Sequence, residues 1–327
     1  MTILFVGGED SDFVGTNKVG EAIFGSVWDS AYSRGYVVNL STTDFTQPGS
    51  GPFTPMSEAW LHWTGGPRTA SGTTLGVLVA MTNAALGQLV RLNTSFGATS
   101  ATIAVNTGTG TYSTSPTFTI PGWPVRQNYD LHVKITGTSI TVDFYAEASL
   151  VYSYTTALTT TYLIDNFQLG PGGGNSLSWS FGHSQVVFAT EPTIDFRVFT
   201  RPPTSDGFYT GFAGTFADVD EVVLDDASIA TNTAQRESFN RATLTVPAGR
   251  EVKAIVVGEL LRNGEPTLTK TRLFLRSCGV DYESADFTVP FGYTYFGKVW
   301  ETDPATGVKW DTTKAQASVE FGVRALA

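Results

Sequence analysis

The chain has 327 residues and a formal net charge of −10, with 20 Lys and Arg against 30 Asp and Glu. Only 15% of the residues are charged and 41% are hydrophobic, a composition that excludes both a disordered chain and a charged helical bundle. The acidic balance argues against a nucleic-acid partner, because phosphate contacts need clustered Lys and Arg.

Short runs rich in Val, Ile, Thr, Tyr and Phe, bounded by Gly, Pro, Asn and Asp, recur up to about residue 200 and predict β-strands. The run 131–142 alternates apolar and polar residues around Gly137-Thr138, which predicts a hairpin with a tight turn. The spacing of the runs, often about 8–15 residues, is typical of an antiparallel sandwich or barrel. Further strands are predicted at 36–40, 60–63, 73–80, 86–92, 99–106, 162–169, 185–189 and 196–199.

A change in composition divides the chain near Pro202-Pro203, a pair that is typical of a stiff linker. Charged residues are roughly twice as frequent after this point as before it, which indicates a second domain. We therefore predict an all-β protein with a larger domain at 1–203 and a smaller β-sandwich at 204–327. In the second domain, strands are predicted at 220–224, 238–246, 251–261, 270–277, 298–301 and 318–324.

The segment from Trp300 to Trp310 predicts a turn that brings two indoles together. Pro304 lies early and Gly307 late in the sequence between them, which suits a tight reversal of the chain. The two Trp side chains would then cover the open end of a small core. A helical turn at about 312–317 and the last strand are expected to follow.

Candidate metal ligands are few and scattered. The single Cys278 allows no intramolecular disulfide, and His62, His132 and His183 lie far apart in the sequence. Glu58 lies near His62 and Asp130 near His132, but one carboxylate beside one His is too small a ligand set for a metal. We expect these His residues to be buried and hydrogen-bonded in strands.

Acidic residues cluster at 9–12 and at 218–226. Alternating carboxylates can supply oxygen ligands for Ca²⁺, but neither cluster matches the twelve-residue calcium loop with its central Gly and terminal Glu. Turn formation and a solvated strand edge explain both clusters equally well. No metal or cofactor is expected.

The motifs of common enzymes are missing from the sequence. No strand carries Glu-x-Asp-x-x-Glu or Glu-x-Asp-x-Glu, the simplest way to place two glycosidase carboxylates on one face. A nucleophile elbow, a P-loop and a dinucleotide-binding glycine pattern are also missing. We therefore expect no catalytic residues and no enzymatic activity.

Trp123 is the contact candidate that the sequence suggests. It lies between Pro121 and Pro124, where we expect it to stay outside the sheet interior and to contact a partner chain or a glycan. The apolar loops 118–125 and 287–296 are expected to be exposed contact surfaces.

Both halves of the chain resemble proteins of tailed-bacteriophage particles. The first domain resembles the concanavalin A-like jelly roll, which also occurs in laminin-G-type modules. The most specific part of the resemblance is the stretch Trp-Glu-Thr-Asp-Pro-Ala-Thr-Gly at 300–307, followed by Trp310. The other segments that carry it are 3–13, 60–63 and 163–170 in the first domain and 253–258 and 273–282 in the second.

The resemblance implies a structural protein of the virion, such as a tail fibre, baseplate appendage or head decoration. Its partners would be other copies of itself, other virion proteins and possible host-surface glycans, with no nucleic acid or membrane among them. The start of the sequence lacks the features of a signal peptide, so synthesis in the host cytoplasm is expected. The alternatives are a glycan-binding module or a polysaccharide-degrading enzyme of the same fold.

Overall fold

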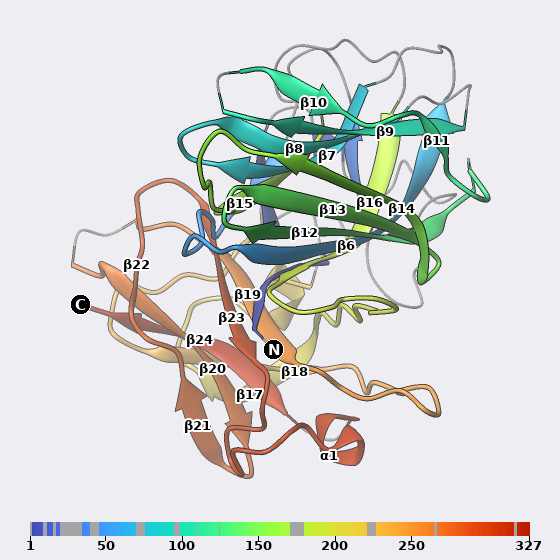
Figure 1. Ribbon diagram of the computed structural model, residues 1–327. Helices are drawn as coiled ribbons and strands as arrows, with labels where there is room; N and C mark the ends of the chain where they lie inside the picture. Colours follow the sequence, from blue (N-terminus) through green and yellow to red (C-terminus); the bar gives the residue numbers. More distant parts are fainter. Residues whose placement is uncertain are drawn as a thin grey trace. The chain divides into compact units, whose positions relative to one another are not determined.

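The structure, a computed structural model, describes most of the chain, and nearly all regular secondary structure in the described residues is β, as the sequence predicts. Within these residues the chain divides into two compact units, Met1–Phe199 and Thr200–Ala327 (Figure 1). The described residues are 2–8, 12–15, 18–19, 35–39, 46–69, 76–94, 99–108, 110–123, 125–170, 180–220, 227–264, 267–316 and 319–327.

The described residues of the first unit form two eight-stranded antiparallel sheets that face each other as layers of a sandwich (Figure 1). The first, here the β6 sheet, has the order β14-β13-β12-β6-β16-β4-β3, with β1 paired to β16. Its strands are β1 (Ile3–Gly7), β3 (Lys18–Val19), β4 (Gly35–Asn39), β6 (Glu58–Thr69), β12 (Gln127–Thr136), β13 (Ser139–Ala146), β14 (Ser149–Ala157) and β16 (Ser180–Ala189).

The second sheet, here the β7 sheet, has the order β10-β9-β8-β7-β15-β5-β2, with β11 paired to β9. Strands far apart in the sequence are neighbours in both sheets, as in a jelly roll. The strands of the β7 sheet are β2 (Phe13–Gly15), β5 (Thr46–Pro48), β7 (Gly76–Asn83), β8 (Gly87–Thr94), β9 (Ser100–Asn106), β10 (Tyr112–Thr114), β11 (Phe118–Thr119) and β15 (Asn166–Leu169).

The core of the first unit lies between the sheets and is rich in aromatic side chains. Along β13 buried and half-buried residues alternate, because successive side chains of a strand point to opposite faces. Trp63, Tyr129 and Phe144 are fully buried, and the last two rings stack with centroids 5.9 Å apart. This alternation separates an apolar inner face from a more polar outer face.

The predicted hairpin at 131–142 is confirmed. β12 and β13 pair in continuous register from Tyr129 opposite Ala146 to Thr136 opposite Ser139. Gly137 has a φ of 60° in the connecting turn, a conformation that favours Gly.

The second unit has a six-stranded sheet, here the β20 sheet, and a separate pair, β19 and β23. The order of the sheet is β17-β18-β24-β20-β21, with β22 also paired to β20. The elements are β17 (Pro203–Thr210), β18 (Arg236–Arg241), β19 (Ile255–Leu261), β20 (Lys270–Ser277), β21 (Val280–Glu283), β22 (Phe287–Thr288), β23 (Thr294–Trp300), helix α1 (Thr312–Gln316), β24 (Glu320–Leu326) and a 3-10 turn at Phe216–Asp218.

The core of the second unit joins its sheet to the β19–β23 pair. Leu273, Leu275 and Val323 from the sheet pack in one buried cluster with Val257 and Phe296 from the pair. The second unit is therefore a smaller β-sandwich, as the sequence predicts.

The predicted turn between Trp300 and Trp310 is confirmed. Both indoles are buried in the core cluster, and Trp310 Nε1 donates to the Trp300 carbonyl oxygen at 2.7 Å. Thr302 and Lys309 form a β-bridge inside this turn, which fixes the reversal. The predicted helical turn corresponds to α1, which begins at Thr312.

Several predicted strands differ from the structure. The strand predicted at 251–261 begins only at Ile255, and the one predicted at 298–301 already begins at Thr294. Residues 196–199 form no strand, and the backbone N–H of Val198 instead donates to the side chain of Gln185. The predicted strand at 238–246 ends at Arg241, before the Pro-Ala-Gly sequence at 247–249, and the one at 162–169 begins only at Asn166. Most of the strand predicted at 220–224 lies outside the described residues.

Replacing Trp310 by Ala should lower the free energy of unfolding of the second unit by about 3–5 kcal/mol, because truncation leaves a cavity and an unpaired carbonyl. Chemical denaturation followed by circular dichroism measures this change. Val308, which is 62% exposed in the same turn, provides a matched control as Val308→Ala. A loss below about 0.5 kcal/mol for Trp310→Ala would show that the two indoles do not close the core.

Candidate functional site

His132 lies on the outer face of the β6 sheet between two carboxylates. Its Nδ1 is 3.0 Å from Asp143 Oδ2 and its Nε2 is 3.0 Å from Glu58 Oε1. The imidazole stacks on Trp60, with ring centroids 4.1 Å apart and planes 16° apart. Asp143 and Trp60 are the residues directly opposite His132 on β13 and β6, so the strand register itself assembles this group.

Glu58 in this group is held in its charged form. Burial raises the pKa of Glu58, but hydrogen bonds from Lys134 and His132 outweigh that effect and lower the pKa. The general acid of a glycosidase needs the opposite, a raised pKa that keeps its proton near neutral pH. The group is therefore suited to structural pairing on the sheet surface.

His62 and Asp130 form a second pair on the same face, and both are buried. His62 Nδ1 is 2.9 Å from Asp130 Oδ1, which also accepts a hydrogen bond from Thr193 Oγ1 at 2.7 Å. Asp130 lies near His132 in the sequence, yet the register places it opposite His62 on β6. The prediction that these two His residues are buried and hydrogen-bonded is confirmed, with partners on neighbouring strands.

For His183 the expected burial is confirmed, but the expected hydrogen bonding is wrong, because this side chain lies in the apolar interior. Its side chain is fully buried near Phe181, with ring centroids 4.7 Å apart. Within the described part of the chain, neither ring nitrogen has a hydrogen-bond partner. Burial lowers the pKa of His183 to about 3, so the folded protein keeps the ring neutral.

Trp123 is buried, and the expectation that it stays outside the sheet interior is wrong. Its side chain is 6% exposed and stacks on Phe181, with centroids 5.6 Å apart. Gly122, which has a φ of 72°, turns the backbone so that the indole points inward, and Val125 remains exposed instead. Phe118 and Ile120 of the same loop are also buried, so this loop offers little apolar surface.

The loop 287–296 carries both exposed and buried aromatic side chains. Phe291 is 75% exposed and Tyr293 is 53% exposed, whereas Tyr295 and Phe296 on β23 are buried. The apolar surface predicted for this loop is therefore confined to its tip.

The acidic clusters behave as turn-forming residues where they are described. Asp12 Oδ2 accepts from the Gly8 backbone N–H at 2.7 Å, and Asp218 Oδ2 accepts from the Thr215 N–H at 2.8 Å. Residues 9–11 and 221–226 lie outside the described residues. Among the residues that are described, no group of three or more His, Cys, Asp or Glu side chains is arranged so that it could hold a metal ion.

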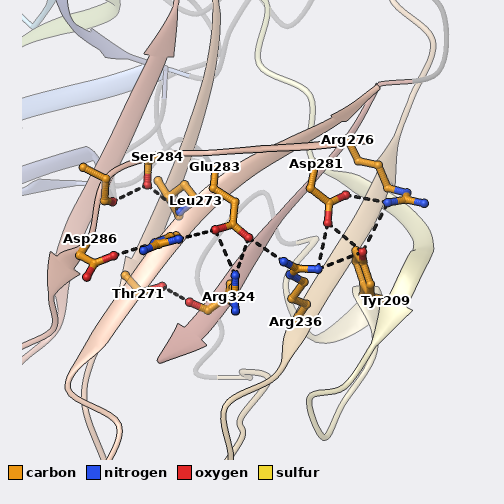
Figure 2. Close-up of polar contacts among 12 residues, drawn as sticks. Tyr209, Arg236, Thr271, Leu273, Arg276, Asp281, Glu283, Ser284, Asp286 and Arg324 are labelled. Atoms are coloured by element: carbon orange, nitrogen blue, oxygen red, sulfur yellow. Dashed lines mark hydrogen bonds and ion pairs between the residues drawn. The ribbon is translucent and has the colours of Figure 1, made fainter. Parts of the chain in front are cut away.

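The largest group of charged side chains lies on the outer face of the β20 sheet (Figure 2). The register places Arg236 opposite Arg324 and Arg324 opposite Arg272, so three arginines stand side by side on β18, β24 and β20. We call these three residues the arginine row. Like charges directly opposite each other in a sheet are destabilising, so the row requires a counter-charge.

Glu283 supplies that counter-charge. Its carboxylate accepts from Arg236 Nη2 at 2.8 Å, from Arg272 Nη1 at 2.7 Å and from Arg324 Nη1 at 2.9 Å. Burial raises the pKa of Glu283, but the hydrogen bonds from Arg272, Arg324 and Arg236 outweigh it and lower the pKa. Figure 2 shows the carboxylate of Glu283 joined to both Arg324 and Arg236.

A second group lies further along the same face. Asp281 Oδ1 accepts from Arg276 Nη1 at 2.6 Å, and Asp281 Oδ2 accepts from the Tyr209 hydroxyl at 2.8 Å (Figure 2). The Arg276 guanidinium lies over the ring of Phe208, 4.1 Å from its centroid, and Phe208 remains 66% exposed. The face thus combines fixed guanidinium groups with an accessible aromatic ring.

An irregular strand pairing presents the two aromatic residues. Residues 207–209 of β17 stand opposite the single residue Ser238, because the register shifts between Asp206 and Thr210. The N–H of Tyr209 donates to Ser238 Oγ at 2.9 Å instead of to a backbone carbonyl. Such bulges redirect side chains at sheet edges.

Sequence reasoning missed this charged face. The signal was present as alternating residues, Arg272 and Arg276 on one strand and Asp281 and Glu283 on the next. Period-two spacing places each pair on one face, but the pairing of Arg272 with Arg324 joins residues about fifty positions apart. No local pattern predicts that register.

Comparisons with known proteins supply no family for this chain. No protein-family model matches it, and no curated protein matches it. A search of solved structures finds the botulinum neurotoxin serotype G binding domain at a TM-score of 0.37 and 8% identity, over 54% of this chain and 42% of that one. This chain therefore spans less than half the length of that domain.

Two further solved structures are similar at the same level. An alginate lyase, A1-II′, has a TM-score of 0.35 and 8% identity, over 50% of this chain and 85% of that one. The Ruminococcus gnavus IT-sialidase CBM40, bound to α2,3-sialyllactose, has a TM-score of 0.32 and 14% identity, over 43% and 80%. The fold assignment rests on the sheets described above, and no function is taken from these likenesses.

In the residues that the structure describes, no helix is long and apolar enough to cross a bilayer.

The buried His183 generates a prediction on acid stability. An unfolded chain binds a proton at this His below about pH 6.5, whereas the folded protein does not, so stability falls as the pH falls from about 6.5 towards 3. The loss amounts to at most about 1.4 kcal/mol for each pH unit.

Replacing His183 by Leu removes the titrating group and keeps an apolar side chain of similar size. Urea unfolding of the first unit, repeated across this pH range, should show the variant gaining stability relative to the wild type as the pH falls. A difference between the two proteins that stays constant with pH would contradict the buried neutral His.

Proposed function

We propose that the protein is a structural component of a tailed-bacteriophage particle that acts by assembly and by adhesion to a host-surface glycan. The observation that carries the proposal is the turn from Trp300 to Trp310. This stretch is the most specific part of the resemblance to phage particle proteins, and in the second unit it closes the core. The resemblance therefore rests on a segment that the fold uses.

Binding rather than catalysis is supported by the state of the acidic side chains. Glu58 and Asp143 are bonded to the two nitrogens of His132, and Asp130 is bonded to His62 and Thr193. Each of these carboxylates has at least one oxygen bonded to a neighbouring side chain, and the lowered pKa of Glu58 does not suit a proton donor. We propose that the chain has no enzymatic activity.

Self-association is supported by the tip of the loop 287–296. Phe291 and Tyr293 are large and exposed, and apolar surface of this kind is typical of protein contacts. Particle proteins are generally arranged in closed symmetric oligomers, in which one patch on each copy is used repeatedly. We propose that other copies of the chain, or other virion proteins, cover this tip in the particle.

Mass spectrometry of washed, purified particles of the encoding phage tests the proposal. The chain should be present in a fixed ratio to the major particle proteins, because a structural component has a defined copy number. Detection in infected-cell lysate together with absence from the washed particles would contradict it and favour a free glycan-binding module.

An activity assay distinguishes the enzymatic alternative. The purified chain should release no reducing sugar from host capsule or lipopolysaccharide. Turnover that is abolished by Glu58→Gln, and retained by the control Glu251→Gln at an exposed site, would establish a polysaccharide-degrading enzyme instead.

A further inference from the structure

We propose that the arginine row of the second unit binds the carboxylate groups of an acidic polysaccharide, and that Arg324 receives the carboxylate. This inference rests on the adhesive part of the proposed function and names the chemical class of its ligand. The arginine row consists of Arg236, Arg324 and Arg272, as defined above.

Arg324 has an unused hydrogen-bonding edge. In the described structure its side-chain bonds are made by Nη1 alone, to the two oxygens of Glu283 at 2.9 and 3.2 Å. The Nε and Nη2 groups, which form the side-on edge of a guanidinium, are left for an outside partner, and the side chain is 34% exposed. Two parallel N–H groups match the two oxygens of a carboxylate.

The flanking arginines make this position attractive to an anion. Arg236 and Arg272 stand on the two sides of Arg324, and all three donate to Glu283. Each flanking arginine also pairs with a second carboxylate, Asp281 for Arg236 and Asp286 for Arg272, whereas the Arg324 side chain is bonded to Glu283 alone in the described structure. A second carboxylate on the solvent side would relieve the repulsion between neighbouring guanidinium groups.

The described side chains of this face carry an excess of positive charge. Among the described side chains of this face, the four arginines and Lys270 oppose four carboxylates, namely Asp281, Glu283, Asp286 and Glu320. Glu320 is four residues from Arg324 along β24, roughly 13 Å at strand spacing, so the excess lies towards the arginine row. The positive charge of this face is opposite in sign to the net charge of the chain, which is −10.

The backbone around the row is fixed before any ligand arrives. Leu273 N–H donates to Ser284 Oγ at 3.1 Å, directly after Glu283, and Thr271 Oγ1 donates to the Arg324 carbonyl at 3.2 Å (Figure 2). Side chains on rigid strands lose little freedom on binding, which favours affinity.

Phe208 explains why the ligand is expected to be a polysaccharide and not a small anion. Its exposed ring lies over Arg276, and Arg276 shares the Asp281 carboxylate with Arg236 of the arginine row, so the ring lies beside one end of the row. A chain of sugar units can place a carboxylate at Arg324 and an apolar sugar face at Phe208. A lone inorganic ion cannot reach both.

Binding of the full chain to immobilised polygalacturonate tests the proposal, with neutral dextran and dextran sulfate as comparison polymers. The wild type should bind polygalacturonate and should not bind dextran. Arg324→Gln should weaken polygalacturonate binding by about tenfold or more, as expected for the loss of a charge-assisted bidentate contact. Arg262→Gln removes the same charge from an exposed arginine that lies over Tyr293, and should change binding less than about twofold.

Arg324→Lys keeps the positive charge but removes the planar guanidinium with its two parallel N–H donors. It therefore tests the bidentate contact with the carboxylate even where Arg324→Gln folds poorly. It should lose several-fold affinity with an unchanged thermal unfolding temperature. Equal weakening by the Arg324 and Arg262 variants, or dextran sulfate binding that all variants share, would show a general polyanion effect and overturn the site.

The two proposals fail in different ways. A chain that is present in washed particles but does not bind polygalacturonate contradicts the carboxylate site alone. A chain that binds through Arg324 but is absent from washed particles keeps the site and contradicts the particle role.

Discussion

The charged face of the second unit depends on the ionised carboxylate of Glu283. Antiparallel pairing brings Arg236, Arg324 and Arg272 into one row, and all three donate hydrogen bonds to this group. Asp281 and Asp286 add a second counter-charge for the two outer arginines only. The lowered pKa of Glu283 expresses the same balance, since the three arginines favour its charged form. The strand register thus creates both the need for an anion and the place where one binds.

In the first unit, ionisable side chains of the outer face pair with one another. Its outer face also carries paired ionisable groups, but here His62 and His132 pair with carboxylates on the neighbouring strands. His132 has both nitrogens engaged and its ring covered by Trp60, so little of its hydrogen-bonding capacity faces outward. The contrast between the two faces is the physical reason for assigning adhesion to the second unit.

Local features of the sequence predicted much of the fold. The alternation around Gly137 and the turn from Trp300 to Trp310 are encoded within short segments, and both are observed. Trp123 shows the limit of such reasoning. Its flanking prolines suggest a loop, but the positive φ of Gly122 turns the indole into the interior beside Phe181. The prolines restrict the backbone and leave the direction of the side chain open.

The candidate site depends on long-range register and could not be predicted in the same way. Arg272 and Glu283 are close in the sequence, whereas Arg236 and Arg324 come from neighbouring strands that are far apart in the sequence. Period-two spacing predicts which residues share a face of one strand, but not which strands are neighbours. The cross-strand partners of His62 and His132 were hidden for the same reason.

A crystal structure of the full chain with a short galacturonate oligosaccharide tests the carboxylate site most directly. The account predicts a carboxylate about 3 Å from Arg324 Nε and Nη2, on the side of the guanidinium away from Glu283, with the next sugars running towards Phe208. An oligosaccharide bound elsewhere on the chain, with solvent at the side-on edge of Arg324, would contradict it.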